Sequence, residues 1–135
     1  MKLFHIDEKT KEEINQMSPL TWAYIGDGVY ELYIRTYLIN KTRLKPHKLH
    51  IEAIKYVKAK AQAEILKKLD SILTLEEQEI VRRGRNTQTH HIAKNASMQE
   101  YMYSTAFEAL IGYLYLTGQE ERLITILEAI LDETN

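Results

Sequence analysis

Residues 23–32 read AYIGDGVYEL and set one aspartate, Asp27, between two glycines in a largely apolar helical segment. A glycine inside a helix costs roughly 1 kcal/mol relative to alanine, so Gly26 and Gly28 need a compensating reason. Close approach of another backbone or of a ligand would supply it. The stretch therefore predicts a helix whose carboxylate lies at a point of close approach.

A second apolar segment has the same character. Residues 106–116 read AFEALIGYLYL, in which Glu108 is the only charge and Gly112 follows one turn later. A carboxylate in a protein core is costly unless it shifts its pKa or meets a cation. One interpretation is structural: an ion pair, with Arg35 or a lysine, or a helix rotation that leaves the carboxylate at the surface. The other is that the two helices cross and that Asp27 and Glu108 bind a hard cation such as Mg²⁺, which prefers carboxylate and water oxygens.

Helical patterns continue along the whole chain, with only 5 glycines, 2 prolines and no alternating strand pattern. Ser18 and Pro19 predict the start of the second helix, whose apolar residues on all sides predict a buried central position. Helices are also expected over 7–17, 47–69, 74 to about 83, 97–117 and 120–131, several of them opened by capping boxes and one ended by Gly118. The sequence predicts one all-α domain over residues 1–135, with six or seven helices.

Composition narrows the classes of function. The chain has no cysteine, which excludes disulfides, thiolate metal sites and a cysteine nucleophile, and suits a reducing compartment. The N-terminal residues lack the apolar core of a signal peptide, and no apolar run is long enough to span a membrane. The expected compartment is the cytoplasm.

Charge is distributed unevenly along the chain. Residues 41–99 carry 13 Lys and Arg against 6 Asp and Glu, although the net charge of the whole chain is −1. A local basic surface attracts polyanions whatever the average charge. The polar mixture after Ile80 suits phosphate and sugar contacts of a nucleic-acid duplex. The RNA-binding candidates are Arg82, Arg83, Arg85, Asn86, Thr87, Lys94 and Asn95. The alternative is a solvated helix end followed by an ordinary loop.

The segments YIGDGVYEL and TAFEALIGYLYL together resemble the paired signature helices of the ribonuclease III catalytic domain. With RRGRN and KNAS, the sequence most closely resembles the mini-ribonuclease III family, which is that domain without an appended double-stranded-RNA-binding domain. The resemblance implies an all-α homodimer that cleaves double-stranded RNA with Mg²⁺, leaves 5′-phosphates and matures 23S ribosomal RNA precursors. It also implies that Asp27 and Glu108 are the catalytic, metal-binding residues. Whether a ribosomal protein assists is open.

The resemblance is incomplete at two positions. Larger ribonuclease III enzymes carry two further carboxylates, four residues before the aspartate and three before the glutamate, on the same helical faces. Ala23 and Thr105 occupy these positions here. We therefore expect weaker Mg²⁺ binding and leave the number of metal ions open.

Two other functions compete with this interpretation. One is a non-catalytic scaffold dimer that binds double-stranded RNA, which the reduced carboxylate set would permit. The other is a metal-dependent nucleotide phosphohydrolase that uses the EEQE run at residues 76–79. Acidic residues are common in the first turn of a helix for dipole reasons alone, so this run is weak support.

Overall fold

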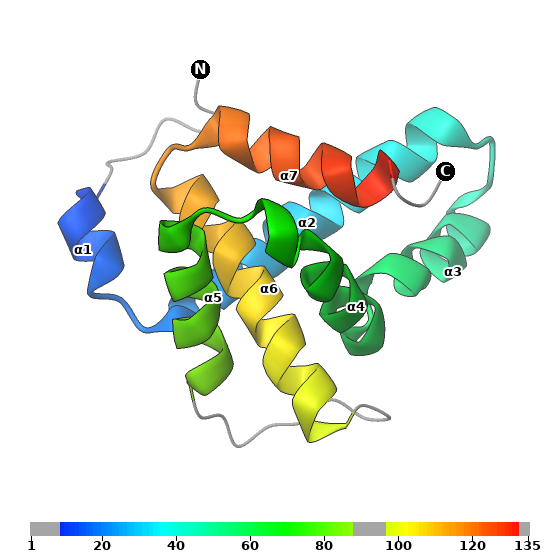
Figure 1. Cartoon of the computed structure of the whole chain (residues 1–135). Coiled ribbons are helices and arrows are strands. Elements are labelled where there is room, and N and C mark those ends of the chain that lie inside the picture. The colour runs from blue at the N-terminus through cyan, green and yellow to red at the C-terminus, as the bar shows by residue number, and fades with distance from the viewer. Residues whose placement is uncertain (1–8, 88–96, 133–135) are drawn as a thin grey trace.

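The structure, a computed structural model, describes residues 9–87 and 97–132, which form helices joined by short loops and contain no strand (Figure 1). The predicted all-α class is confirmed. The elements are α1 (Lys11–Asn15), α2 (Pro19–Lys41), α3 (Pro46–Val57), α4 (Ala59–Leu69), a 3-10 turn (Asp70–Ile72), α5 (Leu75–Asn86), α6 (Met98–Leu116) and α7 (Glu120–Asp132). No helix in the described ranges is both long and apolar enough to cross a bilayer.

Local chemistry sets the starts of α2, α5 and α6 and the end of α6 as the sequence predicts, whereas α1 is shorter than expected and α5 continues to Asn86. The Ser18 hydroxyl accepts from the Leu20 backbone at 3.2 Å, with Pro19 as the first residue of α2. Capping boxes open α5 at Thr74 and α6 at Ser97, each with a glutamate three residues on. Gly118, at φ +71°, ends α6 in the left-handed region that favours glycine.

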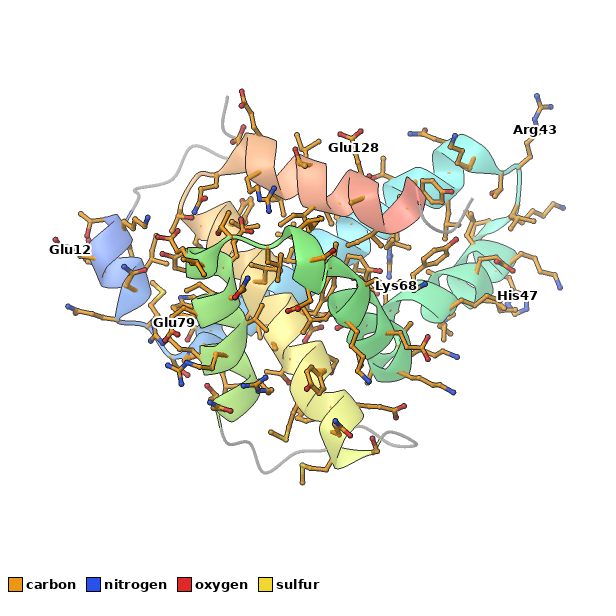
Figure 2. The ribbon with its side chains drawn as sticks, in the orientation of Figure 1. Glu12, Arg43, His47, Lys68, Glu79 and Glu128 are labelled. Atoms are coloured by element: carbon orange, nitrogen blue, oxygen red, sulfur yellow. The ribbon has the colours of Figure 1, made fainter. Side chains whose placement is uncertain are left out.

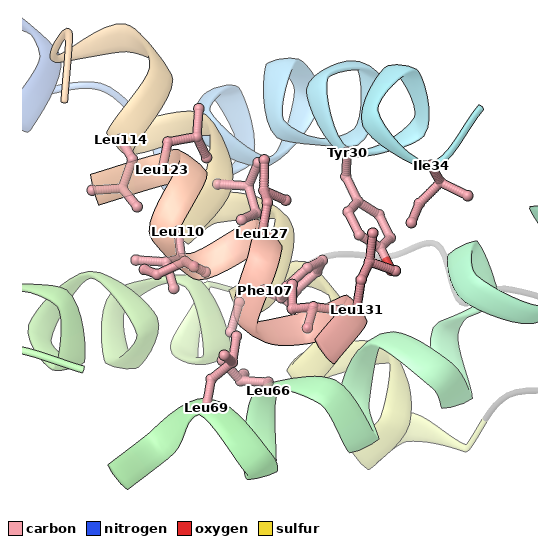
Figure 3. Close-up of a cluster of buried hydrophobic side chains, with 14 of the residues drawn as sticks. Tyr30, Ile34, Leu66, Leu69, Phe107, Leu110, Leu114, Leu123, Leu127 and Leu131 are labelled. Atoms are coloured by element: carbon pink, nitrogen blue, oxygen red, sulfur yellow. The ribbon is translucent and has the colours of Figure 1, made fainter. Parts of the chain in front are cut away.

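The central element is α6, which α2, α4 and α5 surround while α7 lies across it (Figure 1). Side chains from α2, α4, α6 and α7 converge on one core (Figure 3). Its labelled members are Tyr30, Ile34, Leu66, Leu69, Phe107, Leu110, Leu114, Leu123, Leu127 and Leu131. All but one of the residues from Ser104 to Leu114 are buried, and the exception is Glu108. The only charge of this segment therefore lies on the one side of α6 that the other helices leave partly open.

The expectation that α2 is buried on all sides is wrong. Trp22, Tyr30 and Ile34 are fully buried, but the opposite side of α2 carries large apolar residues that face outward. This exposed apolar face consists of Leu20, Tyr24, Leu32 and Ile39, with Tyr24 83% exposed. Helix α2 packs on α6 with one face only, so the sequence carries more apolar surface than the described fold buries.

The single helix expected over 47–69 is two helices. Lys58 has an extended backbone (φ −66°, ψ 154°), which ends α3 and begins α4. Two carbonyls that lose their helical partners here accept side-chain hydrogen bonds instead: Tyr56 O from the Tyr30 hydroxyl at 3.0 Å, and Val57 O from Gln62 Nε2 at 2.9 Å. The break depends on partners from α2 and α4, so the continuous amphipathic pattern did not reveal it.

Candidate active site

The helices α2 and α6 cross at two glycines. A Cβ atom on Gly26 would lie 1.8 Å from the backbone oxygen of Glu108, and one on Gly112 would lie 1.8 Å from that of Trp22. No side chain fits at either position, so the backbones approach directly. Gly28 differs, since a Cβ there would meet nothing within 4 Å. Close backbone approach therefore explains Gly26 and not Gly28.

This crossing brings Asp27 and Glu108 together in one open pocket. Asp27 directly follows Gly26 and Glu108 precedes Gly112 by one turn, so contact between the glycines places both carboxylates on one side. The pocket has a volume of about 520 Å³. Ala23 and Thr105 also line it. The four positions that carry carboxylates in larger ribonuclease III enzymes therefore meet in this pocket, where Asp27 and Glu108 supply carboxylates, Ala23 a methyl group and Thr105 a hydroxyl. The Thr105 hydroxyl donates to Tyr101 O of its own helix at 3.0 Å.

The two carboxylates interact with each other rather than with a cation. Burial, the hydrogen bond with Asp27 and its charge raise the pKa of Glu108 to about 8, and the Gln62 amide opposes this rise. Arg35, the arginine suggested as an ion-pair partner for these carboxylates, instead has its Nη2 atom 3.6 Å from Oε1 of Glu31. Within residues 9–87 and 97–132 no ion pair links a lysine or arginine to either carboxylate. The structural interpretation based on an ion pair with Arg35 is therefore wrong.

Glu108 should make the metal-free protein less stable as the pH rises. Its pKa is near 8 when folded and near 4.5 when unfolded, so between these values the unfolded state loses the proton first. With a chelator present to remove metal ions, the Glu108→Gln variant should therefore gain unfolding free energy relative to the unaltered chain as the pH rises from 5 to 8. The expected gain is about 1–3 kcal/mol after allowance for solvent screening. Urea unfolding of both proteins at pH 5 and at pH 8 measures this gain. If the difference in stability between the two proteins is the same at both pH values, the raised pKa of Glu108 is contradicted.

The donor set fits a hydrated Mg²⁺ ion better than a closed metal cage. Within the described ranges no group of three or more His, Asp or Glu residues is placed to hold a metal. Mg²⁺ is commonly held by only one or two carboxylates, with water and substrate phosphate supplying the remaining oxygens. Two adjacent carboxylates in an open pocket, with no ion-pair partner in the described part of the chain, match that requirement.

The described RNA-binding candidates lie away from this pocket, on α5 and just after it. Arg82 pairs with Glu79, and the Arg83 guanidinium stacks over the buried Trp22 ring, 4.6 Å from its centroid. Arg82 and Arg85 line a separate hollow. Asn86 is exposed, and the Thr87 hydroxyl donates to Arg83 O at 2.7 Å. Lys94 and Asn95 lie outside the described residues.

The EEQE run does not form a second metal site. Glu77 is buried and binds Arg122 through both carboxylate oxygens, each at 2.8 Å. Burial opposes ionisation of Glu77, but hydrogen bonds from Arg122 and Thr74 keep its pKa below the usual value. Glu76 lies 3.0 Å from Lys11, and Glu79 pairs with Arg82. These carboxylates already have cationic or capping partners, which argues against the phosphohydrolase interpretation.

The sequence reasoning missed Gln62. This side chain is 2% exposed, and its amide nitrogen lies 3.5 Å from Glu108 Oε2. A signal was present, because Gln62 precedes Leu66 and Leu69 at helical spacing on the core face of α4. A polar residue at such a position needs hydrogen-bond partners.

Comparison with known proteins identifies the family. The Ribonuclease III domain family matches residues 20–119, a range that contains both carboxylates of the pocket. Proteins named Mini-ribonuclease 3 are similar over most of their length: that of Thermoanaerobacter sp. is 52% identical, covering 88% of this chain and 84% of the relative. That of Staphylococcus aureus is 45% identical, covering 96% and 98%. The chain belongs to the mini-ribonuclease III family.

Membership of the mini-ribonuclease III family makes the chain an endoribonuclease of the class that acts on double-stranded RNA. A solved structure supports the fold. An X-ray crystal structure of a Fusobacterium nucleatum protein superimposes with a TM-score of 0.81 at 31% identity, covering 91% of this chain and 98% of that protein. The family match and this superposition together show a ribonuclease III-type fold.

Proposed function

We propose that the chain is a Mg²⁺-dependent endoribonuclease that uses Asp27 and Glu108 to cleave double-stranded RNA, leaving 5′-phosphates. One observation carries the proposal: the glycine crossing of α2 and α6 brings two carboxylates into contact in an open pocket without a described cationic partner. When bound, Mg²⁺ would activate water and neutralise charge on the scissile phosphate. The ribosomal precursor as substrate, the cytoplasmic location and the single domain over 1–135 stay predictions from the sequence.

The two carboxylates have different surroundings and would do different work. Asp27 is exposed at the surface of α2 and can meet both the ion and the RNA backbone. Glu108 is partly buried on α6 and fixed between Asp27 and Gln62. Binding of a cation favours the ionised form of Glu108, so the RNA-ready site would carry two negative charges balanced by the metal.

The α3 and α4 helices offer a basic surface for the RNA. Nine exposed Lys and Arg side chains lie between residues 41 and 68, at the end of α2, in the loop that follows it and along the two helices, and Figure 2 shows Arg43 and His47 pointing outward. The exposed Lys and Arg residues are Lys41, Arg43, Lys45, Lys48, Lys55, Lys58, Lys60, Lys67 and Lys68. Lys55 is paired with Glu52, and Lys67 lies over the Tyr103 ring. This surface supports backbone contacts that do not depend on base sequence.

Cleavage should depend steeply on salt. A protein that binds a duplex through lysines displaces counterions, and each phosphate neutralised contributes a slope of about −0.9 to the log–log plot of affinity against salt. With about four such contacts, raising the salt from 50 to 200 mM should weaken binding roughly 100-fold. Cleavage measured at subsaturating protein over that range tests this. A nearly constant rate would contradict binding through the basic surface.

The exposed apolar face of α2 favours a homodimer. Leu20 and Tyr24 belong to this face and also line the carboxylate pocket. A second copy packed there would cover apolar side chains that the described fold leaves in water, and would set two pockets around a twofold axis. Two such sites match the pseudo-twofold symmetry of a duplex and would cut both strands.

The competing function is a non-catalytic scaffold that binds double-stranded RNA. The experiment that separates the two uses purified protein with labelled duplex RNA, single-stranded RNA and duplex DNA, with Mg²⁺ or with EDTA. We expect cleavage of duplex RNA only, and only with metal. Tight binding of duplex RNA without cleavage under any divalent metal would favour the scaffold.

A further inference from the structure

The side chain of Gln62 joins the break between α3 and α4 to the carboxylate pocket. Its amide nitrogen donates to Val57 O at 2.9 Å and lies 3.5 Å from Glu108 Oε2. An amide NH₂ group has two hydrogens, so one nitrogen can serve both acceptors. The reverse orientation would set the Gln62 carbonyl against two acceptor oxygens, so these contacts select the amide orientation.

The environment of Gln62 gives the amide no freedom to turn. The side chain is 2% exposed, and its carbonyl oxygen is buried without a hydrogen-bond partner in the described part of the chain. A buried carbonyl without a partner costs free energy. The amide keeps this arrangement because its nitrogen serves the freed carbonyl of Val57 and the carboxylate of Glu108 together.

Other side chains at position 62 would change the pocket in ways that the amide does not. Leucine or methionine would fill the volume but offer no donor to Glu108. Glutamate would add a third negative charge beside Asp27, and lysine would neutralise the pair that a metal needs. A neutral donor orients the carboxylate and leaves the charge of the pocket available to a cation.

We propose that Gln62 is a positioning residue that holds the Glu108 carboxylate toward Asp27, so that both can bind one divalent cation. This inference rests on the proposed function of the same site. The inference also gives the helix break at Lys58 a role in the pocket, in addition to ending α3. Because α4 begins anew there, the first turn of α4 carries an amide that reaches both the end of α3 and α6.

Gln62 also has a structural role at Val57, and Tyr30→Phe is the matched control for it. The Tyr30 hydroxyl donates to Tyr56 O, the neighbouring carbonyl of the same break, at 3.0 Å. Its loss removes one side-chain hydrogen bond from the break but none from Glu108. Gln62→Met removes a comparable bond together with the contact to Glu108, while keeping the side-chain shape.

The test measures Mn²⁺ binding to the full chain without RNA by electron paramagnetic resonance, beside thermal unfolding and kcat and KM for a duplex RNA. Both variants should lose some thermal stability. Only Gln62→Met should weaken Mn²⁺ binding, by about 10-fold, and lower kcat by a similar factor with KM little changed. If Gln62→Met does not fold, Gln62→Asn, which keeps the amide but shortens its reach, should show the same loss of Mn²⁺ affinity.

Two results would overturn the inference alone: unchanged Mn²⁺ binding and kcat in a folded Gln62 variant, or an equal loss of both in Tyr30→Phe. In either case the unaltered chain still binds Mn²⁺ and cuts duplex RNA, so the proposed function stands. An unaltered chain that neither binds Mn²⁺ nor cuts duplex RNA would overturn the proposed function and this inference together.

Discussion

Asp27→Asn and Glu108→Gln should each lower the cleavage rate of duplex RNA by about 10³-fold or more, while the protein stays folded and still binds the duplex. A metal ion that stabilises transition-state charge is worth several kcal/mol, and each 1.36 kcal/mol corresponds to about a tenfold change in rate. Each substitution keeps the side-chain size and removes one of the two carboxylates among the described residues that line the pocket. Single-turnover cleavage at saturating protein measures the chemical step separately from binding.

The matched control is Glu128→Gln. Glu128 is an exposed carboxylate on α7 (Figure 2) that does not line the pocket, and its substitution likewise removes one carboxylate. Its cleavage rate should equal that of the unaltered chain. If both pocket variants cut at that rate as well, Asp27 and Glu108 are not the catalytic residues. If they lose cleavage because they no longer fold, circular dichroism will show it.

Glu108→Gln should change stability and activity in opposite directions. The same substitution that removes catalysis removes the cost of ionising a partly buried carboxylate beside Asp27, and so stabilises the metal-free protein at neutral pH. A residue kept at a position where it destabilises the fold is typical of functional sites. The scaffold interpretation gives no reason for this pair of carboxylates.

Features of the fold that depend on local chemistry were predictable from the sequence. The starts of α2, α5 and α6 and the end of α6 follow from capping residues, and the structure confirms them. The break at Lys58 was not predictable in this way, because its backbone carbonyls are satisfied by Tyr30 and Gln62, whose positions depend on tertiary packing. The exposed face of α2 was missed for a similar reason: periodicity counts apolar residues but does not say how many neighbours cover them.

The candidate site was predictable where its residues are charged and their neighbours in the sequence are apolar. Glu108 is the only charge in an apolar stretch of helix, and Asp27 stands between two glycines in a largely apolar one; both contrasts are visible in the amino-acid sequence itself. Gln62 is an uncharged polar residue in a helix rich in lysine, so its burial beside Glu108 becomes evident only from the packing of α4 on α6. The two glycines that flank Asp27 looked equivalent, yet only Gly26 lies at the helix crossing.

That difference gives the largest expected effect on stability. Gly26→Ala would place a methyl group 1.8 Å from the backbone oxygen of Glu108, and no rotamer change can move a backbone. The helices must separate, and we expect a loss of at least about 3 kcal/mol, or failure to fold, because overpacking alone costs 1–3 kcal/mol where side chains can adjust. Gly112→Ala should behave in the same way, since its methyl would meet Trp22 O at the same distance.

Gly28→Ala is the control on the same helix, two residues away. Its methyl would meet no atom within 4 Å, and alanine favours a helix over glycine, so this variant should gain about 0.5–1 kcal/mol. Urea unfolding of both variants gives the comparison. Similar stabilities for Gly26→Ala and Gly28→Ala would mean that the backbones of α2 and α6 do not touch at Gly26. Asp27 and Glu108 would then lack the contact that brings them together, because the site exists only where two helices meet without side chains between them.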